Sequence, residues 1–308
     1  MIIIPDQEVE YFNDRIVLID ADCVAYYGAA GCDELPSRSA FRRIDLRMEQ
    51  IIDDCGTKNN KSFLTGRTNF RDDVATLKRY KEGRYSKDGK RTKEQPMWLQ
   101  ECRQYLIDNW GATVSVYEEA DDTISIAAAN LKDKYEVYIS SLDKDLRINP
   151  VLYHNQASGD ITESDYLGSI KKVKTKLIGS GGLFFYSQML MGDSVDSIQG
   201  LPKVTQYMKD TYGVPRLGGC GASAAWHVLK DVQTLEEAER RVFRCYASYW
   251  DFHTYFDWRS DLIVHKAGRS ITIKQFIEQG RLLWMRTKVG EMWIPKYLTE
   301  KELNKREI

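Results

Sequence analysis

The sequence predicts an α/β fold: a mostly parallel central sheet flanked by helices, with a basic arch and a smaller C-terminal helical region. Segments with strand character alternate with amphipathic segments through the first half of the chain. Strands that alternate with helices in this way usually pair in parallel. The segment 15–19 is apolar from Ile16 to Ile19, which is typical of a strand buried on both faces.

The expected elements follow in chain order. After the strand at 15–19, apolar residues recur at helical spacing from Phe41 to Ile52, and Gly56 provides a stop. A short strand is expected at 62–64. Pro96 opens a helix that runs to Trp110. The next expected elements are a strand at 113–117, a helix at 119–131 and a strand at 136–140.

The pattern changes near residue 155. Residues 160–178 are polar and rich in lysine, and 180–182 resemble a turn before a helix at 183–191. The later sequence has a mostly helical pattern, with a glycine-rich turn at 218–221 ahead of a helix at 222–230. We therefore expect two parts: an α/β core at 1–178, which includes the basic arch at 78–95, and a helical region at 179–308.

Composition narrows the class of protein. The chain has 308 residues, a net charge of −1 and 43% hydrophobic residues, which are ordinary values for a soluble globular protein. No run of about 18 apolar residues is present, so we expect no membrane span. Residues 1–5 are too few and too uncharged to be a secretory signal.

The usual catalytic and metal-binding motifs of cysteine, histidine and serine are missing from the sequence. The six cysteines show no Cys-x-x-Cys spacing, which suits reduced thiols in a cytosolic compartment. No two of the four histidines are three or four residues apart, which argues against a histidine-based zinc site. The sequence contains neither a P-loop nor a Gly-x-Ser-x-Gly motif. The acidic residues are left as the candidates for chemistry.

Acidic residues gather in four short groups, each beside a predicted strand end or helix start. The groups are Asp20 and Asp22; Glu119, Asp121 and Asp122; Asp143 and Asp145; and Asp193 and Asp196. Residues two apart in an extended chain point the same way, and residues three apart on a helix share a face. Acids brought together in this way repel one another unless cations neutralise them, and Mg²⁺ or Mn²⁺ suits oxygen ligands.

Any single acidic pair is more often a solvated surface pair or a helix cap, and 45 acidic residues produce close pairs by chance. Four groups placed where an α/β sheet meets its ligand-binding edge favour a metal site instead. The acids therefore predict a metal-dependent phosphoryl-transfer site.

Residues 78–93 read KRYKEGRYSKDGKRTK, in which basic residues outnumber acidic ones. The segment is too long for a plain connection, so it is either a functional loop or disordered. Local basic patches bind nucleic acid even when the total charge is balanced. The alternative is a solvated basic face with no ligand.

Several motifs together resemble those of the 5′-nuclease family, which includes the flap endonucleases, and are most similar to the 5′–3′ exonucleases of lytic phages. They are Glu-Ala-Asp-Asp at 119–122, Ser-Leu-Asp-Lys-Asp-Leu at 141–146, and Gly-Asp-Ser-Val-Asp-Ser-Ile-Gln-Gly at 192–200. Asn-Phe-Arg at 69–71 and Tyr-Lys-Glu-Gly-Arg at 80–84 resemble the entry to the family's helical arch. The matches follow the family's order from about residue 16 to 230, with a weaker match in the tail at 279–295.

The resemblance implies two bound Mg²⁺ ions, for which Mn²⁺ can substitute, and assigns roles to individual residues. The implied metal ligands are Asp20, Glu119, Asp121, Asp122, Asp143, Asp145, Asp193 and Asp196. Asp22 fits the cluster by spacing, although the family position often holds another residue type. Lys81 and Arg84 are implied as catalytic residues that offset charge on the scissile phosphate. The implied nucleic-acid contacts are Arg71, Lys78, Lys90, Arg91, Lys93, Gly219, Gly221 and Ser223.

The implied function is metal-dependent 5′–3′ exonuclease activity on DNA, with the RNA strand of RNA–DNA hybrids as a further substrate and phage DNA replication as the setting. The helical region would bind duplex and complete the metal site. Two alternatives stay open: a structure-specific flap endonuclease, or a nucleic-acid binding module whose metal site has decayed. The expected partner is DNA with 5′ ends or flaps, no membrane partner is expected, and the expected location is the cytoplasm, that of the host if the chain is viral.

Three positions depart from the family pattern. Gly66 stands where the family usually has a metal-binding aspartate, and this is the feature that favours a decayed site. Gln199 replaces the usual proline. The glycine hairpin at 219–225 lacks the family's lysine, so its phosphate contact is weaker or moves to Lys203 or Arg216.

Overall fold

The structure is a computed structural model that describes residues 9–86, 88–259 and 264–300. Small parts of the expected ranges therefore lie outside the described residues. They are residues 1–8, residue 87 of the basic arch, and residues 260–263 and 301–308 of the helical region. The expectation that residues 1–5 are not a secretory signal therefore concerns residues outside the described ones.

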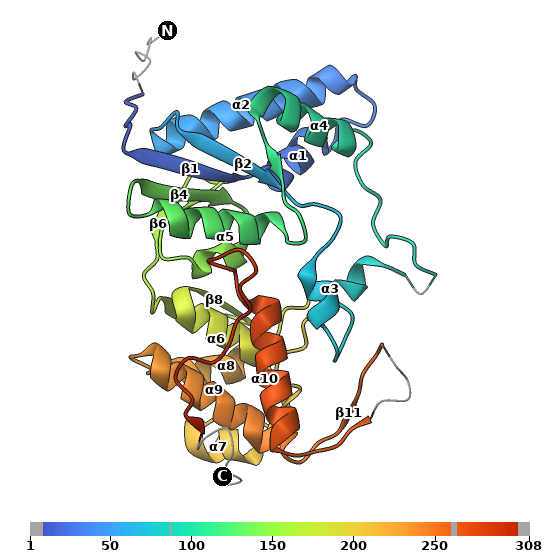
Figure 1. The fold of residues 1–308 in the computed structure, drawn as a ribbon, viewed down its shortest axis with the longest axis vertical. Coiled ribbons are helices and arrows are strands. Elements are labelled where there is room, and N and C mark those ends of the chain that lie inside the picture. The colour runs from blue at the N-terminus through green and yellow to red at the C-terminus, as the bar shows by residue number, and fades with distance from the viewer. Residues whose placement is uncertain (1–8, 87, 260–263, 301–308) are drawn as a thin grey trace.

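A six-stranded sheet with the strand order β3-β2-β1-β4-β5-β6 forms the centre of the N-terminal half (Figure 1). Its strands are β1 (Arg15–Asp20), β2 (Asn60–Leu64), β3 (Thr113–Val114), β4 (Glu136–Ser141), β5 (Leu152–Asn155) and β6 (Ile161–Glu163). All neighbours pair in parallel except β6, which is antiparallel to β5. The α/β class and the mostly parallel sheet are thus confirmed.

Strand β1 is apolar from Ile16 to Ile19, and helices cover both faces of the sheet there. Val17 and Ile19 point into a core shared with α1 (Ala21–Ala29), α2 (Ser37–Cys55) and α4 (Leu99–Trp110). Ile16 and Leu18 point the other way, toward α5 (Ala120–Leu131). This arrangement places the start of α5 next to the carboxyl end of the sheet.

Helix ends agree well with the expected glycine stops. Gly56 and Gly111 end α2 and α4 in the left-handed conformation, with φ of 61° and 64°. The strand expected at 113–117 is shorter and ends at Val114. The helix expected from Pro96 begins at Leu99.

In the described residues, the C-terminal half is mostly helical, with three small two-stranded antiparallel sheets. Its helices are α6 (Gly181–Met191), α7 (Gln206–Tyr212), α8 (Ala222–Leu229), α9 (Leu235–Trp250) and α10 (Arg269–Leu283). Its strands are β7 (Ser169–Val173), β8 (Lys176–Ser180), β9 (Lys203–Val204), β10 (Gly218–Gly219), β11 (Tyr255–Phe256) and β12 (Val264–His265). The core of this half also includes Ala75, Tyr80 and Ile148, so the two halves share buried contacts.

The basic arch connects the sheet domain to α4 and projects from the body of the molecule (Figure 1). It follows a short helix, α3 (Phe70–Val74), and contains the 3₁₀ turn η1 (Glu82–Arg84). A second 3₁₀ turn, η2 (Lys144–Ile148), follows β4. In the described arch, the only strand-like pairing is the bridge between Tyr85 and Arg91.

Within the described ranges, no helix combines the length and the apolar character needed to cross a membrane. All six cysteines are free thiols.

Candidate active site

Two aspartates lie at the carboxyl ends of the adjacent parallel strands β1 and β4. Asp20 caps α1 and accepts hydrogen bonds from the Asp22 amide at 3.1 Å and the Ser141 hydroxyl at 2.7 Å. Asp143 caps η2 and accepts the Asp145 amide at 2.8 Å. Because parallel strands bring their carboxyl ends to one edge, the two aspartates belong to a single site.

Asp121, in the first turn of α5, completes this group, which we call the sheet-edge acids: Asp20, Asp121 and Asp143. Burial raises the pKa of Asp121 well above its ordinary value, and the negative charges of Asp143 and Asp20 add to this shift. Burial, with a smaller contribution from the negative charge of Asp145, raises the pKa of Asp143 to about 7. These carboxylates therefore need a proton or a cation to be stable together.

The second pair of acids meets around a lysine. The Lys144 ammonium donates to Asp193 at 2.6 Å and to Asp145 at 3.1 Å. The Gln188 amide of α6 also donates to Asp145 at 2.6 Å. Burial raises the pKa of Asp145, and the charge of Asp193 adds to this shift. Residues of the sheet half and of the helical half thus share this part of the site.

Asp193 and Asp196 were expected on one helix face, and this expectation is wrong. They lie in a tight loop closed by two backbone hydrogen bonds between Asp193 and Ile198, at 2.8 and 2.9 Å. The Asp193 carboxylate accepts the Val195 amide at 2.8 Å, which fixes the turn. The two acids converge because of this turn rather than because of helical spacing.

The base of the arch contacts a third pair of acids. The Tyr80 hydroxyl lies 2.7 Å from Glu119 and 2.9 Å from Asp196. The Lys81 ammonium bonds to Glu119 and lies 3.7 Å from Asp196, and Arg84 lies 3.2 Å from Asp196. Burial acts to raise the pKa of Glu119, but the charge of Lys81 holds it below its ordinary value.

We call Glu119, Asp145, Asp193 and Asp196 the cation-bound acids, because each contacts a lysine or an arginine. Backbone contacts support this arrangement: the Lys81 amide donates to the Asp196 carbonyl at 2.8 Å, and the Gly83 amide donates to Ser197 at 3.0 Å. The arch base is therefore attached to the 193–198 loop.

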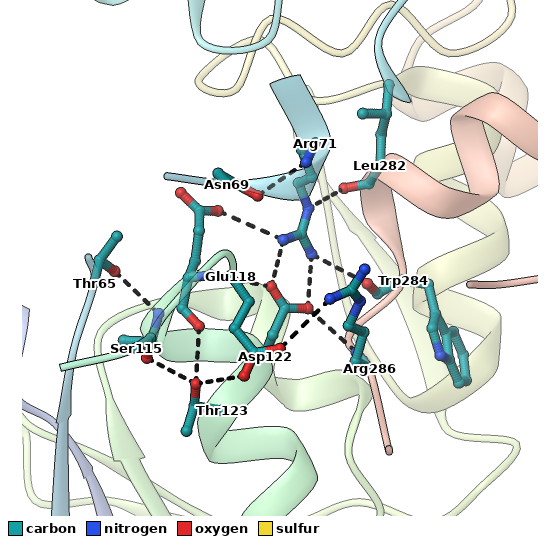
Figure 2. Close-up of polar contacts among 12 residues, drawn as sticks. Thr65, Asn69, Arg71, Ser115, Glu118, Asp122, Thr123, Leu282, Trp284 and Arg286 are labelled. Atoms are coloured by element: carbon teal, nitrogen blue, oxygen red, sulfur yellow. Dashed lines mark hydrogen bonds and ion pairs between the residues drawn. The ribbon is translucent and has the colours of Figure 1, made fainter. Parts of the chain in front are cut away.

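Asp122 is paired with a buried arginine, Arg71, whose guanidinium also lies 3.8 Å from Glu119. Both oxygens of Asp122 accept hydrogen bonds from the Arg71 guanidinium, one of them at 3.0 Å (Figure 2). Asp122 is 0% exposed and Arg71 is 1% exposed. Arg71 is therefore not accessible to nucleic acid, in contrast to its expected role, and Asp122 is committed to a protein partner.

Asp22 and Gly66 are two positions at which the sequence differs from the pattern of the family that it resembles. Asp22 bonds to Arg103 and accepts the Thr65 amide at 2.8 Å, so it too has protein partners. A Cβ atom on Gly66 would lie 2.1 Å from the Ser115 carbonyl oxygen. The backbone at Gly66 therefore leaves no room for the aspartate usual in the family.

The remaining expected nucleic-acid contacts lie on the surface. Lys78, Lys90, Arg91 and Lys93 of the arch are exposed. Nothing lies within 4 Å of the positions that Cβ atoms would take on Gly219 and Gly221. The start of α8 has no side-chain cap, and Ser223 accepts a hydrogen bond from Lys172 of β7 at 3.1 Å.

The side-chain oxygens of the site suit hard divalent ions, although the acids do not lie close enough together to enclose an ion. In the described part of the chain, no three His, Cys, Asp or Glu side chains form a ready-made metal site. Among the residues that the structure describes, the sheet-edge acids nevertheless lack ion-pair partners, and the buried Gln188 carbonyl oxygen has no hydrogen-bond partner. Carboxylate oxygens without a counter-cation and an unpaired amide oxygen are ligands that suit Mg²⁺ and Mn²⁺.

Four residues of the site were missed by the sequence analysis: Tyr80, Ser141, Lys144 and Gln188. The sequence did indicate that Lys144 lies in the site, because it stands between two predicted metal ligands, Asp143 and Asp145. Gln188 gave a weaker indication, as a polar residue within the apolar helix α6. The other two gave no chemical signal in the sequence, since their partners lie far away along the chain.

No protein-family model matches the chain, and no curated protein matches it. Solved structures do match, and among them are structures of a 5′-exonuclease and a flap endonuclease of bacteriophage T5. The six-stranded, mostly parallel sheet with flanking helices is therefore the fold of a 5′-nuclease.

The particular protein that supports this assignment is the 5′-exonuclease of bacteriophage T5, in a structure with bound divalent metal ions (zinc). It has a TM-score of 0.50 and 16% identity, and the match covers 75% of this chain and 87% of that chain. A bacteriophage T5 flap endonuclease in a pseudo-enzyme–product complex with DNA and metal ions has a TM-score of 0.47 and 14% identity. That match covers 87% of this chain and 99% of the other chain.

Proposed function

We propose that this chain is a divalent-metal-dependent nuclease that hydrolyses phosphodiester bonds of DNA from 5′ ends. The observation that carries the proposal is the meeting of buried acids with raised pKa values at the carboxyl edge of the sheet. The likeness of the fold to the 5′-exonuclease of bacteriophage T5 supports the reaction class and its polarity.

Two Mg²⁺ ions, replaceable by Mn²⁺, are the proposed cofactors. The sheet-edge acids would hold one ion, and Asp145 and Asp193, with Asp196 and Glu119, would hold the other. Bound ions of this kind activate water and stabilise charge on the attacking and leaving oxygens. The protein's own task is to keep the acids ionised and correctly placed.

Lys81, Lys144 and Arg84 are proposed to balance charge before and after DNA binds. Lys81 and Lys144 now neutralise the cation-bound acids. Arg84 has a side chain that is 46% exposed, so it can reach a phosphate. A guanidinium or ammonium that exchanges a carboxylate for a phosphate oxygen stabilises the charge that develops during hydrolysis.

The arch and the glycine hairpin are proposed as the DNA-binding surfaces. The exposed basic residues of the arch suit the phosphates of a single strand with a free 5′ end. At the hairpin, the open backbone at Gly219 and Gly221 permits close approach of a duplex phosphate. Lys172 stands beside Ser223, and Lys203 is paired in register with Gly219, so either supplies the cation that the hairpin lacks.

A cleavage assay tests the proposal. Duplex DNA, a 5′ flap and an RNA–DNA hybrid, each labelled at the 5′ end, are incubated with and without Mg²⁺. We expect Mg²⁺-dependent release of short products from the 5′ end, and none when the 5′ end carries a bulky adduct. Matched substrates labelled at the 3′ end control for polarity.

The product lengths separate the alternatives. Short products from duplex ends support the exonuclease, whereas release of whole flaps alone supports the flap endonuclease. Binding of all three substrates without cleavage at any Mg²⁺ or Mn²⁺ concentration would support the decayed binding module and refute the proposal.

A further inference from the structure

A buried ion pair ties together three segments that are distant in the sequence. The Arg71 guanidinium holds Asp122 with two donors, two further donors go to backbone carbonyls, and its Nη1 also lies 3.8 Å from Glu119. Its Nε donates to Leu282 at 2.9 Å and its Nη2 donates to Trp284 at 3.1 Å (Figure 2). The pair therefore joins α3, the start of α5 and the segment that follows α10.

Arg286 reinforces the same junction from the C-terminal side. Its amide donates to Asp122 at 3.3 Å, and its guanidinium lies 3.5 Å from Glu118 and 3.4 Å from the centroid of the Phe70 ring. The segment 282–286 is thus held by charge, by backbone hydrogen bonds and by a cation–π contact. We call this junction, made by Arg71, Asp122 and residues 282–286, the C-terminal clamp.

The clamp acts on the part of α5 that carries the site. Asp122 directly follows Asp121, and it also closes the capping box by accepting the Glu119 amide at 3.4 Å. A shift of the first turn of α5 would therefore move Asp121 and Glu119 together. These two acids belong to the two different groups of the site.

The clamp also reaches the base of the arch. Arg71 lies on α3, which leads directly to Tyr80 and Lys81. A second anchor on α10 supports the same connection: the Glu278 carboxylate accepts the amides of Thr76 and Leu77 at 2.7 and 2.9 Å. Helix α10 and the residues after it therefore position the arch base relative to the acids.

We infer that Asp122 and Arg71 are positioning residues, through which segment 282–286 holds the acids of α5 and the arch base in one arrangement. This role differs from the metal ligand and the nucleic-acid contact that the family resemblance implies. A carboxylate with both oxygens committed to a buried guanidinium has little capacity left for an ion. The effect on catalysis rests on the proposed function, whereas the mechanical role of the clamp does not.

The test compares Asp122→Asn, Arg71→Lys and the double variant with the wild-type protein. Asp122→Asn keeps the shape of the side chain and removes its charge, and Arg71→Lys keeps the charge and removes the forked geometry. Arg241→Lys is the control, because Arg241 is likewise an arginine with two acidic partners, although it is less deeply buried than Arg71, and it lies on α9 away from the site. Circular dichroism establishes that each variant is folded.

Hydrogen exchange measured by mass spectrometry reports the clamp without reference to activity. We expect the peptides that cover 282–290 and 119–124 to exchange at least about tenfold faster in both single variants, and no faster in the double variant than in the worse single one. Arg241→Lys should leave both peptides unchanged. If Asp122→Asn does not fold, Arg71→Lys alone makes the same comparison.

Mn²⁺ binding to the DNA-free protein separates positioning from ligation. If exchange in Asp122→Asn stayed at the wild-type level while Mn²⁺ affinity was lost, Asp122 would be a ligand and the inference would be overturned. Wild-type exchange in both single variants would overturn it as well. A wild-type protein that cleaves no substrate would refute the proposed function alone, because the exchange results stand without it.

Discussion

The sheet-edge acids and the cation-bound acids lie in one site but are neutralised in different ways. Asp20, Asp121 and Asp143 make no ion pair among the described residues, and the pKa values of two of them are raised. The cation-bound acids each contact Lys81, Lys144 or Arg84, and the pKa of Glu119 is lowered. The protein thus supplies its own cations to one half of the site and leaves the other half for a ligand.

This difference follows from where the basic side chains originate. Lys81 and Arg84 come from the arch base, and Lys144 comes from η2 beside the helical half. The sheet edge is covered by α1 and α5, whose first turns contribute acids but no basic residues. A substrate that draws Lys81 and Arg84 away would leave Glu119 and Asp196, like the sheet-edge acids, in need of a cation.

The largest expected effect comes from neutralising one acid of each half. We expect Asp143→Asn and Asp145→Asn each to lower the single-turnover cleavage rate by about 10³-fold, roughly 4 kcal/mol, because each removes a proposed metal ligand. DNA binding, measured by fluorescence anisotropy in Ca²⁺, should survive. Unimpaired turnover of either variant at saturating Mg²⁺ would contradict the assignment of that half.

The second largest effect is expected at Lys81, whose ammonium group pairs with Glu119 inside the site. We expect Lys81→Ala to slow single-turnover cleavage by about 10²-fold while it weakens DNA binding only a few-fold, because the ammonium acts on charge that develops during the reaction. Lys78→Ala, three residues earlier and on the exposed surface, is the matched control. A loss of affinity with an intact single-turnover rate would show that Lys81 merely binds DNA.

A substitution at Gly66 tests whether this chain can accommodate the aspartate that the resembled family usually has at this position. We expect Gly66→Asp to destabilise the fold by about 2 kcal/mol or more, because its Cβ would collide with the Ser115 carbonyl oxygen and force a backbone shift. Gly66→Ala should destabilise similarly, whereas Gly219→Ala, at a position with open space, should not. Chemical denaturation measures all three. Higher cleavage activity in a stable Gly66→Asp variant would show that the site lacks a ligand it can accommodate.

The smallest effect is expected in the outer arch. Lys90→Ala and Lys93→Ala should each weaken DNA binding a few-fold and lower the salt dependence of binding by about one unit, because each removes one phosphate contact. Their single-turnover rates at saturating DNA should equal that of the wild-type protein. A selective loss of rate would place these lysines in the reaction centre instead.

Much of this arrangement was predictable because it is local. Gly56 and Gly111 end helices through their own conformational freedom, and the apolar run at 16–19 signals a strand buried on both faces. Asp20 and Asp143 follow strands, so their convergence at the sheet edge follows from parallel pairing alone.

The remaining features depend on contacts between distant residues. The turn at 193–198 takes its shape from hydrogen bonds within the loop and from its attachment to the arch base. The role of Asp122 depends on Arg71, which lies 51 residues earlier, and on carbonyl groups beyond α10. Spacing along the sequence could place Asp122 on the acidic helix start, but it could not show which partner its side chain would meet.

The most direct test of the central claim is thermal unfolding of the DNA-free protein with and without Mg²⁺, at constant ionic strength. If the sheet-edge acids await an external cation, Mg²⁺ at about 100 times its dissociation constant should stabilise the wild-type protein by about 2.7 kcal/mol. Without metal, Asp143→Asn should be at least as stable as the wild-type protein, because repulsion among the acids is relieved, and Mg²⁺ should stabilise it less. An unfolding temperature that Mg²⁺ leaves unchanged in the wild-type protein, or a metal-free Asp143→Asn variant that is markedly less stable, would contradict the account.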